Sequence, residues 1–361
     1  MKRREFIKGL SAGGLLAGGT LAGAAVAKDK EVKHRWRMAT AWPANFPGMG
    51  TGATALAKLI TEMSGGRIEV RVFGAGELVP PFEIFDAVAR GTVEMGHGAS
   101  YYWTGKSEAA QFFSAVPFGF TAQEMNAWLY HGGGMELWRE TYAPFGVVPT
   151  AAANTGVQMG GWFNKEINTV DDLRGLRMRI PGLGGEVLKA AGGTPVNLPG
   201  GEIFTSLRSG AIDAVEWVGP YNDLAFGLHR AAKYYYYPGW HEPGTTLECI
   251  INQKALDALS ADLRAIVLNA CKVANQDVLA DYTARNNSAL HQLVNRHKVN
   301  LRKFPDPVLK RLRDLSEDVM NGIARRDRQS RKVWDSFTQF RDQVVPWHDV
   351  SELAYLQARN L

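Results

Sequence analysis

Two stretches of the chain, EIFDAVARGTVEMGHGAS (Glu83–Ser100) and EIFTSLRSGAIDAVEWVG (Glu202–Gly219), resemble each other at a constant offset of 119 residues. Both begin with Glu-Ile-Phe and place a glycine at the ninth position, Gly91 in the first copy and Gly210 in the second. A helix that stops at the glycine, followed by a short apolar strand, fits this pattern. Because internal repeats reveal architecture directly, we predict two related halves, each of domain size.

Helical and strand-like patterns alternate through both halves, which is typical of an α/β fold with parallel sheets. In the first half we expect strands over Trp36–Ala41 and Arg67–Phe73 and a helix over Thr51–Met63. In the second half we expect strands over Thr155–Phe163 and Arg177–Ile180. Ligands of open α/β sheets collect beyond the carboxyl ends of strands, so we predict one cleft between the halves.

Four strong polar side chains interrupt apolar stretches in the second half: Gln158, Arg179, Glu216 and Glu242. Isolated groups of this kind are costly to bury unless something pairs with them. One guanidinium, two carboxylates and one amide suit a small anion that binds together with a cation. The alternatives, a surface arginine on an edge strand and a structural salt bridge, remain open at this point.

The residue types in this set favour an oxygen-ligated ion. An arginine fork matches a carboxylate bidentately, which suits Arg179. Glu216, Glu242, Gln158 and the carbonyl of Trp217 are hard oxygen ligands suited to Na⁺ or Ca²⁺. The chain has no Cys or His spacing typical of a Zn²⁺ site, which argues against zinc.

Two matches to esterase motifs do not make an active site. Gly9–Gly13 has the pattern G-x-S-x-G, but its serine lies in a predicted signal segment. The HGGG run at His131–Gly134 follows a helical stretch and is predicted to end that helix. No nucleophile is placed beside a base, and we therefore expect a protein that is not an enzyme.

Residues 1–27 have the three parts of a secretory signal: a basic start, a Gly/Ala-rich apolar run, and Ala-Val-Ala before the expected cleavage after Ala27. The Arg3-Arg4 pair favours the twin-arginine route, so we expect a periplasmic protein. This segment carries a net charge of +3 and the whole chain +5, which leaves +2. A charge this small gives no support for nucleic-acid binding. The oxidising periplasm permits a Cys249–Cys271 bridge, but two buried thiols are equally plausible.

Four segments resemble the periplasmic solute-binding subunits of tripartite ATP-independent periplasmic (TRAP) transporters nearly word for word: NTGVQMGGWF (154–163), RMR (177–179), IDAVEWVGPY (212–221) and YYYYPGW (234–240). The match extends over the whole chain after the signal segment. It is closest to the branch that binds 2-oxo acids or lactate with a metal ion. This resemblance implies a two-lobed, periplasmic-binding-protein-like α/β fold with an interdomain cleft, hinge strands and long C-terminal helices.

The resemblance also implies a division of the chain. Domain I would comprise residues 28–150 and about 240–285, and domain II residues 151–239 with part of the C-terminal region. The pattern is helical from Ser260 nearly to the end, more than one domain needs. The segment from about 306 to 361 would brace the domains or dock onto a partner chain. Because that branch forms dimers by exchanging a C-terminal helix, we expect a homodimer.

Carried over by position, the resemblance implies that Arg179 clamps the carboxylate of the solute. Gln158 would touch both solute and ion, Asn154 and Tyr101 would hydrogen-bond the solute, and Trp217 would line the site.

The ion would be held by Glu216, Glu242 and the Trp217 carbonyl, together with Gln158. The segment departs from the pattern at His241 and Pro243, which flank Glu242.

These residues predict a periplasmic receptor that delivers a pyruvate- or lactate-like monocarboxylate to a membrane permease. The competing hypothesis is a metal-dependent secreted enzyme that acts on a small carboxylate through Glu216 and Glu242. The sequence leaves open which carboxylate binds and whether the ion is Na⁺ or Ca²⁺.

Overall fold

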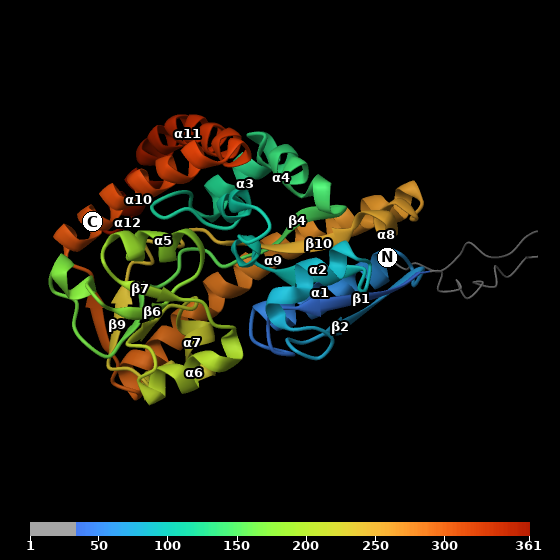
Figure 1. Ribbon diagram of the computed structural model, residues 1–361. Coiled ribbons are helices and arrows are strands. Elements are labelled where there is room, and N and C mark those ends of the chain that lie inside the picture. Colours follow the sequence, from blue (N-terminus) through green and yellow to red (C-terminus); the bar gives the residue numbers. More distant parts are fainter. Residues whose placement is uncertain (1–33) are drawn as a thin grey trace, which may run out of the picture.

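The computed structural model describes residues 34–361, which form two lobes, each built on one sheet (Figure 1). The expected signal segment, residues 1–27, lies outside the described residues. Within residues 34–361, no helix combines the length and the apolar character that crossing a membrane requires.

The first sheet has five strands in the order β2-β1-β3-β10-β4. Strand β1 pairs in parallel with β2 and β3, whereas β10 pairs antiparallel with β3 and β4. The strands are β1 (His34–Thr40), β2 (Ile68–Phe73), β3 (Met95–Gly98), β4 (Val147–Asn154) and β10 (Thr246–Asn252). The helices of this lobe are α1 (Met49–Met63), α2 (Ile84–Ala89), α3 (Ala122–His131), α4 (Gly134–Tyr142) and α8 (Gln253–Asp257).

The second sheet has six strands in the order β11-β9-β5-β8-β6-β7. Strand β8 pairs in parallel with β6 and antiparallel with β5. The strands are β5 (Gly161–Phe163), β6 (Arg177–Arg179), β7 (Thr194–Val196), β8 (Ala214–Val215), β9 (Tyr234–Tyr237) and β11 (Asn300–Lys303). The helices of this lobe are α5 (Gly182–Ala190), α6 (Gly200–Ser209) and α7 (Pro220–Phe226).

The predicted repeat is present in the two lobes. In each copy a helix, α2 or α6, is followed by a glycine in the left-handed conformation, with φ of 74° at Gly91 and 76° at Gly210. This conformation ends a helix and strains any residue with a Cβ. A central strand follows in each lobe, β3 in the first and β8 in the second.

The two copies also anchor their strands in the same way. The Glu94 carboxylate accepts the backbone N–H of Arg37 at 2.8 Å, and the Asp213 carboxylate accepts that of Arg177 at 3.0 Å. Each acid also pairs with the guanidinium of the same arginine. An acid just before the repeat strand therefore fixes the neighbouring strand in both lobes.

Two predictions about the strands are wrong. The strand expected over Thr155–Phe163 is confined to Gly161–Phe163, because Gly156 has a φ of 69° and residues 155–160 form a loop. The preceding strand β4 occupies residues 147–154 instead. The sheets are mixed and not purely parallel, since β10 and β5 each run antiparallel to their neighbours.

Helix α9 (Ala261–His291) links the lobes (Figure 1). Its 31 residues span about 46 Å. The helix packs on β4 and α1 of the first lobe and on α7 of the second. There the Tyr282 hydroxyl donates to Asn222 Oδ1 at 2.7 Å, and Asn286 Oδ1 accepts the backbone N–H of Tyr221 at 2.9 Å. One rigid helix thus contacts both lobes.

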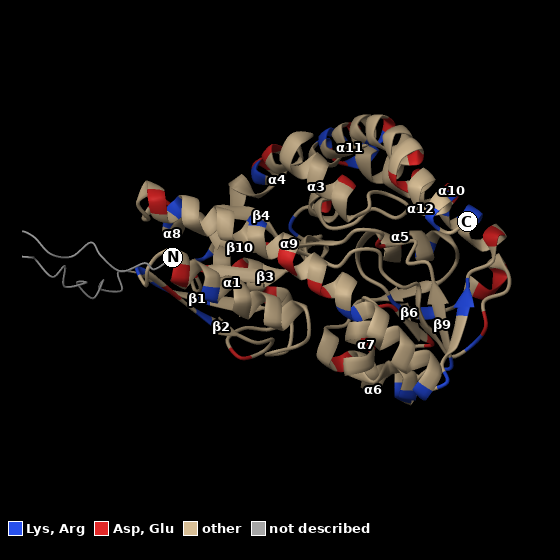
Figure 2. Cartoon of the chain, turned by 180° about the vertical axis from the view of Figure 1, so that it is seen from behind, with Lys and Arg blue, Asp and Glu red and all other residues tan. Residues whose placement is uncertain are grey.

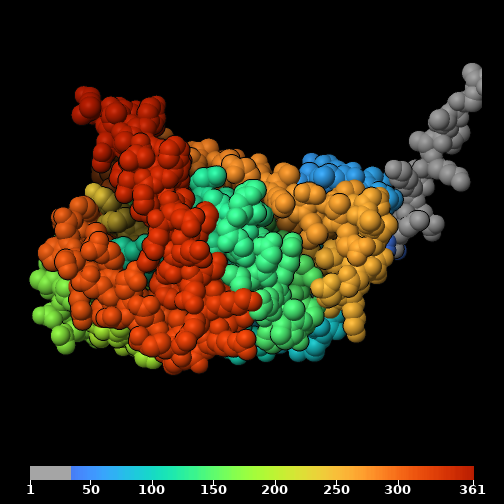
Figure 3. Space-filling model, turned by 90° about the horizontal axis from the view of Figure 1, so that it is seen from above, coloured from blue at the N-terminus to red at the C-terminus, as the bar shows by residue number. Residues whose placement is uncertain are grey.

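The C-terminal helices α10 (Asp306–Arg326), α11 (Arg328–His348) and α12 (Ala354–Arg359) form the predicted long helical segment. Helix α10 packs against α5 of the second lobe, and α11 packs against α4 of the first. Charges of both signs are interspersed on α11 (Figure 2). The end of the segment projects from the body of the molecule (Figure 3).

The HGGG run was predicted to end a helix, and the two cysteines to be either bridged or buried as thiols. Helix α3 ends at His131, and Gly133 has a φ of 86° before α4 begins, as a helix-ending run requires. Cys249 on β10 and Cys271 on α9 are buried free thiols in this structure.

A buried carboxyl on β10 ties the first lobe together. Glu248 is fully buried and accepts hydrogen bonds from Trp103 Nε1 and, at 3.0 Å, from the Tyr142 hydroxyl. Burial raises the pKa of Glu248 to about 8, against the partial opposition of these two donors. The folded protein therefore holds a proton that the unfolded chain releases above its ordinary pKa near 4.5.

Glu248 should make stability fall with rising pH. Its contribution is fully present below about pH 4.5 and is lost as pH rises through about 8, because the unfolded chain binds fewer protons across that window. Glu248→Gln remains neutral and can keep both contacts. Urea unfolding at pH 5 and at pH 9 measures the free energy of unfolding of both proteins. From pH 5 to pH 9, the value for the variant minus that for wild type should increase by on the order of a few kcal/mol. The exposed control Glu69→Gln should show no such change, and parallel pH curves for Glu248→Gln and wild type would contradict the assignment.

Candidate functional site

Arg179 and Glu216 meet at the carboxyl ends of two adjacent parallel strands. Arg179 is the last residue of β6, and Glu216 follows β8, whose Val215 is in register with Arg179. The backbone N–H of Glu216 donates to the Arg179 carbonyl at 3.1 Å. Arg179 Nη1 donates to both the carbonyl and the carboxylate of Glu216. With exposures of 1% and 0%, the two side chains form a buried ion pair.

Gln158 and Glu242 lie on two loops that are joined by backbone hydrogen bonds. The Gly239 N–H donates to the Gln158 carbonyl at 2.9 Å, and the Gln158 N–H donates to the Glu242 carbonyl at 3.2 Å. A Cβ on Gly239 would lie 2.3 Å from the Gln158 oxygen, so only glycine permits this approach. The Gln158 side chain then donates to the Glu242 carboxylate at 2.8 Å.

Aromatic rings from both lobes enclose the ion pair. The Trp217 ring lies 4.9 Å from the Arg179 guanidinium carbon, a cation–π contact. Across the lobe boundary, Trp217 meets Trp42 and Phe46 edge to face. The Tyr102 hydroxyl accepts from Arg179 Nη2 at 3.4 Å. The lobes therefore close directly over the ion pair, which excludes bulk water and strengthens its electrostatics.

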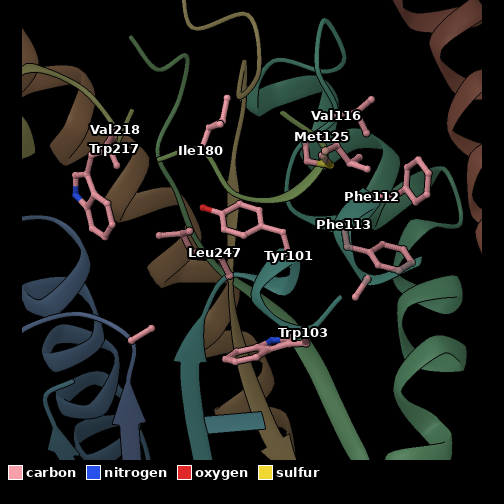
Figure 4. Packing of buried hydrophobic residues seen from close by; sticks show 14 of the residues in the cluster. Tyr101, Trp103, Phe112, Phe113, Val116, Met125, Ile180, Trp217, Val218 and Leu247 are labelled. Atoms are coloured by element: carbon pink, nitrogen blue, oxygen red, sulfur yellow. The ribbon is translucent and has the colours of Figure 1, made fainter. Parts of the chain in front are cut away.

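Tyr101 contributes a buried phenol to the same enclosure. Figure 4 shows its ring near Ile180 of the second lobe and Leu247 of the first, in one apolar cluster. Burial raises its pKa well above the ordinary value, and the nearby carboxylates of Glu242 and Glu216 raise it further. The hydroxyl therefore stays protonated and available as a hydrogen-bond donor.

Asn154 lies at the end of β4, and its side chain is engaged with the backbone. Its amide nitrogen donates to the Gly244 carbonyl at 3.1 Å, and its oxygen accepts the Gly156 N–H at 2.8 Å. Among the described residues it forms no hydrogen bond with Arg179 or Gln158. Asn154 orders the loop that carries Gln158.

His241 was not among the predicted site residues, yet it lies in the centre of the site. Its Nε2 is 3.1 Å from Glu216 Oε2, and both side chains are fully buried. Glu216, His241 and Glu242 each offer a ligand atom, and these atoms all lie within 4.8 Å of one another. This cluster therefore includes a histidine nitrogen that residue spacing in the sequence does not reveal. The only signal in the sequence was the position of His241 beside Glu242.

The charges of the site fit a cation. Burial raises the pKa of the Glu242 carboxyl to about 7, and the neighbouring Glu216 carboxylate adds to the rise. Burial opposes the charge on Arg179, but the Glu216 carboxylate raises its pKa overall. One guanidinium thus faces two carboxyl groups. The buried Gln158 Oε1 also has no hydrogen-bond partner in the described structure, so an oxygen ligand remains available.

A hollow of about 430 Å³ reaches Tyr101 from the side of the C-terminal helices. Its lining combines Tyr101 and Glu108 of the first lobe with Ile180 and Gly182 of the second, and Arg326 of α10. Glu108 and Arg326 form an ion pair at 3.7 Å. The hollow therefore lies along the seam between the lobes, with Tyr101 of the site in its wall.

The chain is similar in sequence and fold to several known proteins. A monocarboxylate 2-oxoacid-binding periplasmic protein of Nostoc sp. is 46% identical over 321 residues, covering 89% of this chain and 88% of the relative. A TRAP periplasmic solute-binding protein of Pseudoalteromonas atlantica, solved with sodium and pyruvate, is 46% identical with a TM-score of 0.88, covering 90% of this chain and 99% of the other. That of Colwellia psychrerythraea, solved with calcium and pyruvate, is 42% identical at the same TM-score and the same coverage.

These matches confirm the resemblance to TRAP solute-binding subunits and the two-lobed α/β fold. The family model for bacterial extracellular solute-binding protein family 7 matches residues 38–327, which is most of the chain. The protein belongs to bacterial extracellular solute-binding protein family 7.

Proposed function

We propose that the protein is the periplasmic solute receptor of a TRAP transporter. It binds a small 2-oxo or 2-hydroxy monocarboxylate, pyruvate- or lactate-like, together with Na⁺ or Ca²⁺, and delivers it to the membrane permease. The observation that carries this proposal is the buried Arg179 guanidinium beside the Glu216–Glu242 cluster. Relatives that share more than 40% of the sequence hold pyruvate with sodium or calcium, which supports the choice of solute and ion.

In this proposal Arg179 binds the solute carboxylate through its guanidinium fork, and Tyr101 donates from its protonated hydroxyl. Trp217 provides an apolar wall, with its ring against Arg179. The Asn154 amide nitrogen already donates to the Gly244 carbonyl at 3.1 Å and to Thr246 Oγ1 at 3.4 Å. A hydrogen bond from Asn154 to the solute would therefore replace the longer of these two contacts.

The ion is bound by the Glu216 and Glu242 carboxylates, by Gln158 and by the Trp217 carbonyl. A solute carboxylate adds a third negative group to a site that holds one guanidinium. Like charges in a closed site are strongly unfavourable, and a cation with oxygen ligands offsets them. Solute and ion should therefore bind cooperatively.

The receptor would act in the periplasm. It would be exported there by the twin-arginine route, and residues 1–27 would be cleaved off. Closure of two lobes over a solute is a hinge motion that links affinity to shape. The permease would recognise the closed, solute-bound form. The contacts between Trp217 of the second lobe and Trp42 and Phe46 of the first support closure of this kind.

The chain also carries a surface that suits a second copy of itself. Large apolar side chains are exposed near the C-terminus: Trp347 at 63%, Val350 at 72% and Tyr355 at 64%. Exposed apolar groups concentrated on one projecting segment mark an interaction site. We infer that residues 306–361 form the arm of a homodimer.

Arg179→Lys should weaken pyruvate binding, because lysine keeps the charge but loses the planar fork. Arg179→Ala should cost about 2–5 kcal/mol, as loss of one partner from a buried charge pair does. Isothermal titration calorimetry with pyruvate measures both. The matched control is Arg177→Lys, two residues earlier on β6, where the guanidinium is half-exposed and pairs with Asp213; this variant should bind normally. Wild-type affinity in Arg179→Ala would show that another group holds the carboxylate.

Pyruvate affinity should fall by at least about tenfold after chelation and exhaustive desalting, since Arg179 alone cannot balance three negative groups. Adding back Na⁺ or Ca²⁺ should restore it. Glu216→Gln should reduce this dependence while lowering ion affinity. Unchanged affinity in ion-free buffer would mean that the acids are structural. NMR of the same samples should show pyruvate unaltered, and turnover would instead favour the metal-dependent enzyme acting through Glu216 and Glu242.

Removing residues 349–361 should convert a dimer into a monomer without unfolding the lobes, because α12 packs mainly on the adjoining segment 349–353 and the deletion keeps the ion pair of His348 with Glu124 of α3. Sedimentation velocity on the whole chain and the truncated chain measures this. A double substitution of Trp347 and Tyr355 by glutamate should have the same effect. A monomeric whole chain would contradict the proposed arm.

A further inference from the structure

We propose that His241 provides a nitrogen ligand to the buried Glu216–Glu242 cluster, so that the site accepts borderline divalent transition ions such as Zn²⁺ in addition to Na⁺ or Ca²⁺. This inference rests on the proposed function, because the same cluster is the proposed ion site. It adds a ligand and an ion class that the oxygen-only assignment does not include.

Geometry is the first support. The ligand atoms of Glu216, His241 and Glu242 lie within 4.8 Å of one another. Ligand atoms about 2.0–2.2 Å from one zinc ion lie at most about 4.4 Å apart, so small side-chain rotations suffice for all three to share an ion. All three side chains are buried. The backbone N–H of Glu216 donates to the Arg179 carbonyl, and the Glu242 carbonyl accepts the backbone N–H of Gln158. Backbone hydrogen bonds therefore hold both acidic residues of the cluster in position.

The chemistry of the ligand set is the second support. Na⁺ and Ca²⁺ take oxygen ligands, whereas imidazole nitrogen suits Zn²⁺ and its neighbours among the transition metals. Histidine nitrogen and carboxylate oxygen are both ligands that Zn²⁺ takes from proteins, and this cluster offers one histidine and two carboxylates. Gln158 Oε1, buried and without a hydrogen-bond partner in the described part of the chain, provides a further oxygen beside Glu242.

A different role for His241 has to be separated from ligation. Its Nε2 can donate to Glu216 Oε2 across the observed 3.1 Å and simply hold that carboxylate in place. Glutamine can preserve such a donated hydrogen bond but has no imidazole nitrogen. The variant His241→Gln therefore keeps the positioning role and removes the nitrogen ligand.

The test uses whole protein stripped of metal and labelled with ¹⁵N at its eight histidines. Titration with Zn²⁺ alone should shift one imidazole nitrogen to the position of a metal-bound nitrogen, and this signal should be missing in His241→Gln. Calorimetry with Zn²⁺ and, separately, with Ca²⁺ should show that His241→Gln loses at least about tenfold more affinity for Zn²⁺ than for Ca²⁺. The wild-type spectrum tests the proposal even if the variant folds poorly.

The control is His229→Gln. His229 and His297 have ring centroids 4.1 Å apart near the surface of the second lobe, where they can capture Zn²⁺ adventitiously. Loss of the shifted signal in this variant, and not in His241→Gln, would overturn the proposal. Equal losses of Zn²⁺ and Ca²⁺ affinity in His241→Gln would overturn it as well, since they would reveal a positioning residue only.

The failure of this inference can be told apart from failure of the proposed function. Pyruvate calorimetry on the wild-type protein in Ca²⁺ tests the receptor independently of zinc. If pyruvate binds but no imidazole nitrogen is metal-bound, the receptor function stands and the proposed nitrogen ligand is wrong. If His241 is metal-bound but pyruvate does not bind with any ion, the metal site stands and the receptor function is wrong.

Discussion

The buried ion pair between Arg179 and Glu216 is the interaction on which the rest of the site depends. A charge taken out of water is costly, and its partner must compensate through good geometry and additional hydrogen bonds. Here the guanidinium donates to the carboxylate and the carbonyl of Glu216, and the Trp217 ring covers it. That arrangement is possible only because β6 and β8 run in parallel and end at the same edge. The Glu242 carboxyl is then left without a guanidinium of its own.

Much of this architecture follows from the sequence, because local signals and tertiary structure agree. The repeated Glu-Ile-Phe segments and the glycines that end their helices predict two related lobes, and Gly91 and Gly210 have the required left-handed backbone. Glu216 was recognisable because it is a lone charge at the end of an apolar strand, and Arg179 because it ends the segment RMR just before a Pro-Gly loop. Their contact follows from the parallel order of two strands, which the alternating pattern predicts.

The parts that the sequence does not reveal arise from contacts between distant loops. His241 meets Glu216 across 25 residues, and no periodicity links them. The strand expected over residues 155–163 is mostly apolar apart from Gln158, but Gly156 has a positive φ and residues 155–160 form a loop. That loop brings Gln158 to Glu242. Antiparallel insertion of β10 and β5 into their sheets also depends on long-range pairing, which strand patterns do not encode.

The contacts of Glu216 give a physical reason for cooperation between ion and solute. One oxygen of its carboxylate accepts from Arg179 and the other faces His241. In the proposed roles, the ion needs these oxygens and the solute needs the guanidinium. Ion and solute therefore both compete with the Arg179–Glu216 ion pair. An ion that binds Glu216 frees the Arg179 guanidinium for the solute, and a solute that binds Arg179 frees the Glu216 carboxylate for the ion. Two ligands that share the cost of breaking one contact must strengthen each other's binding reciprocally. A receptor built in this way binds each ligand most tightly when the other is present.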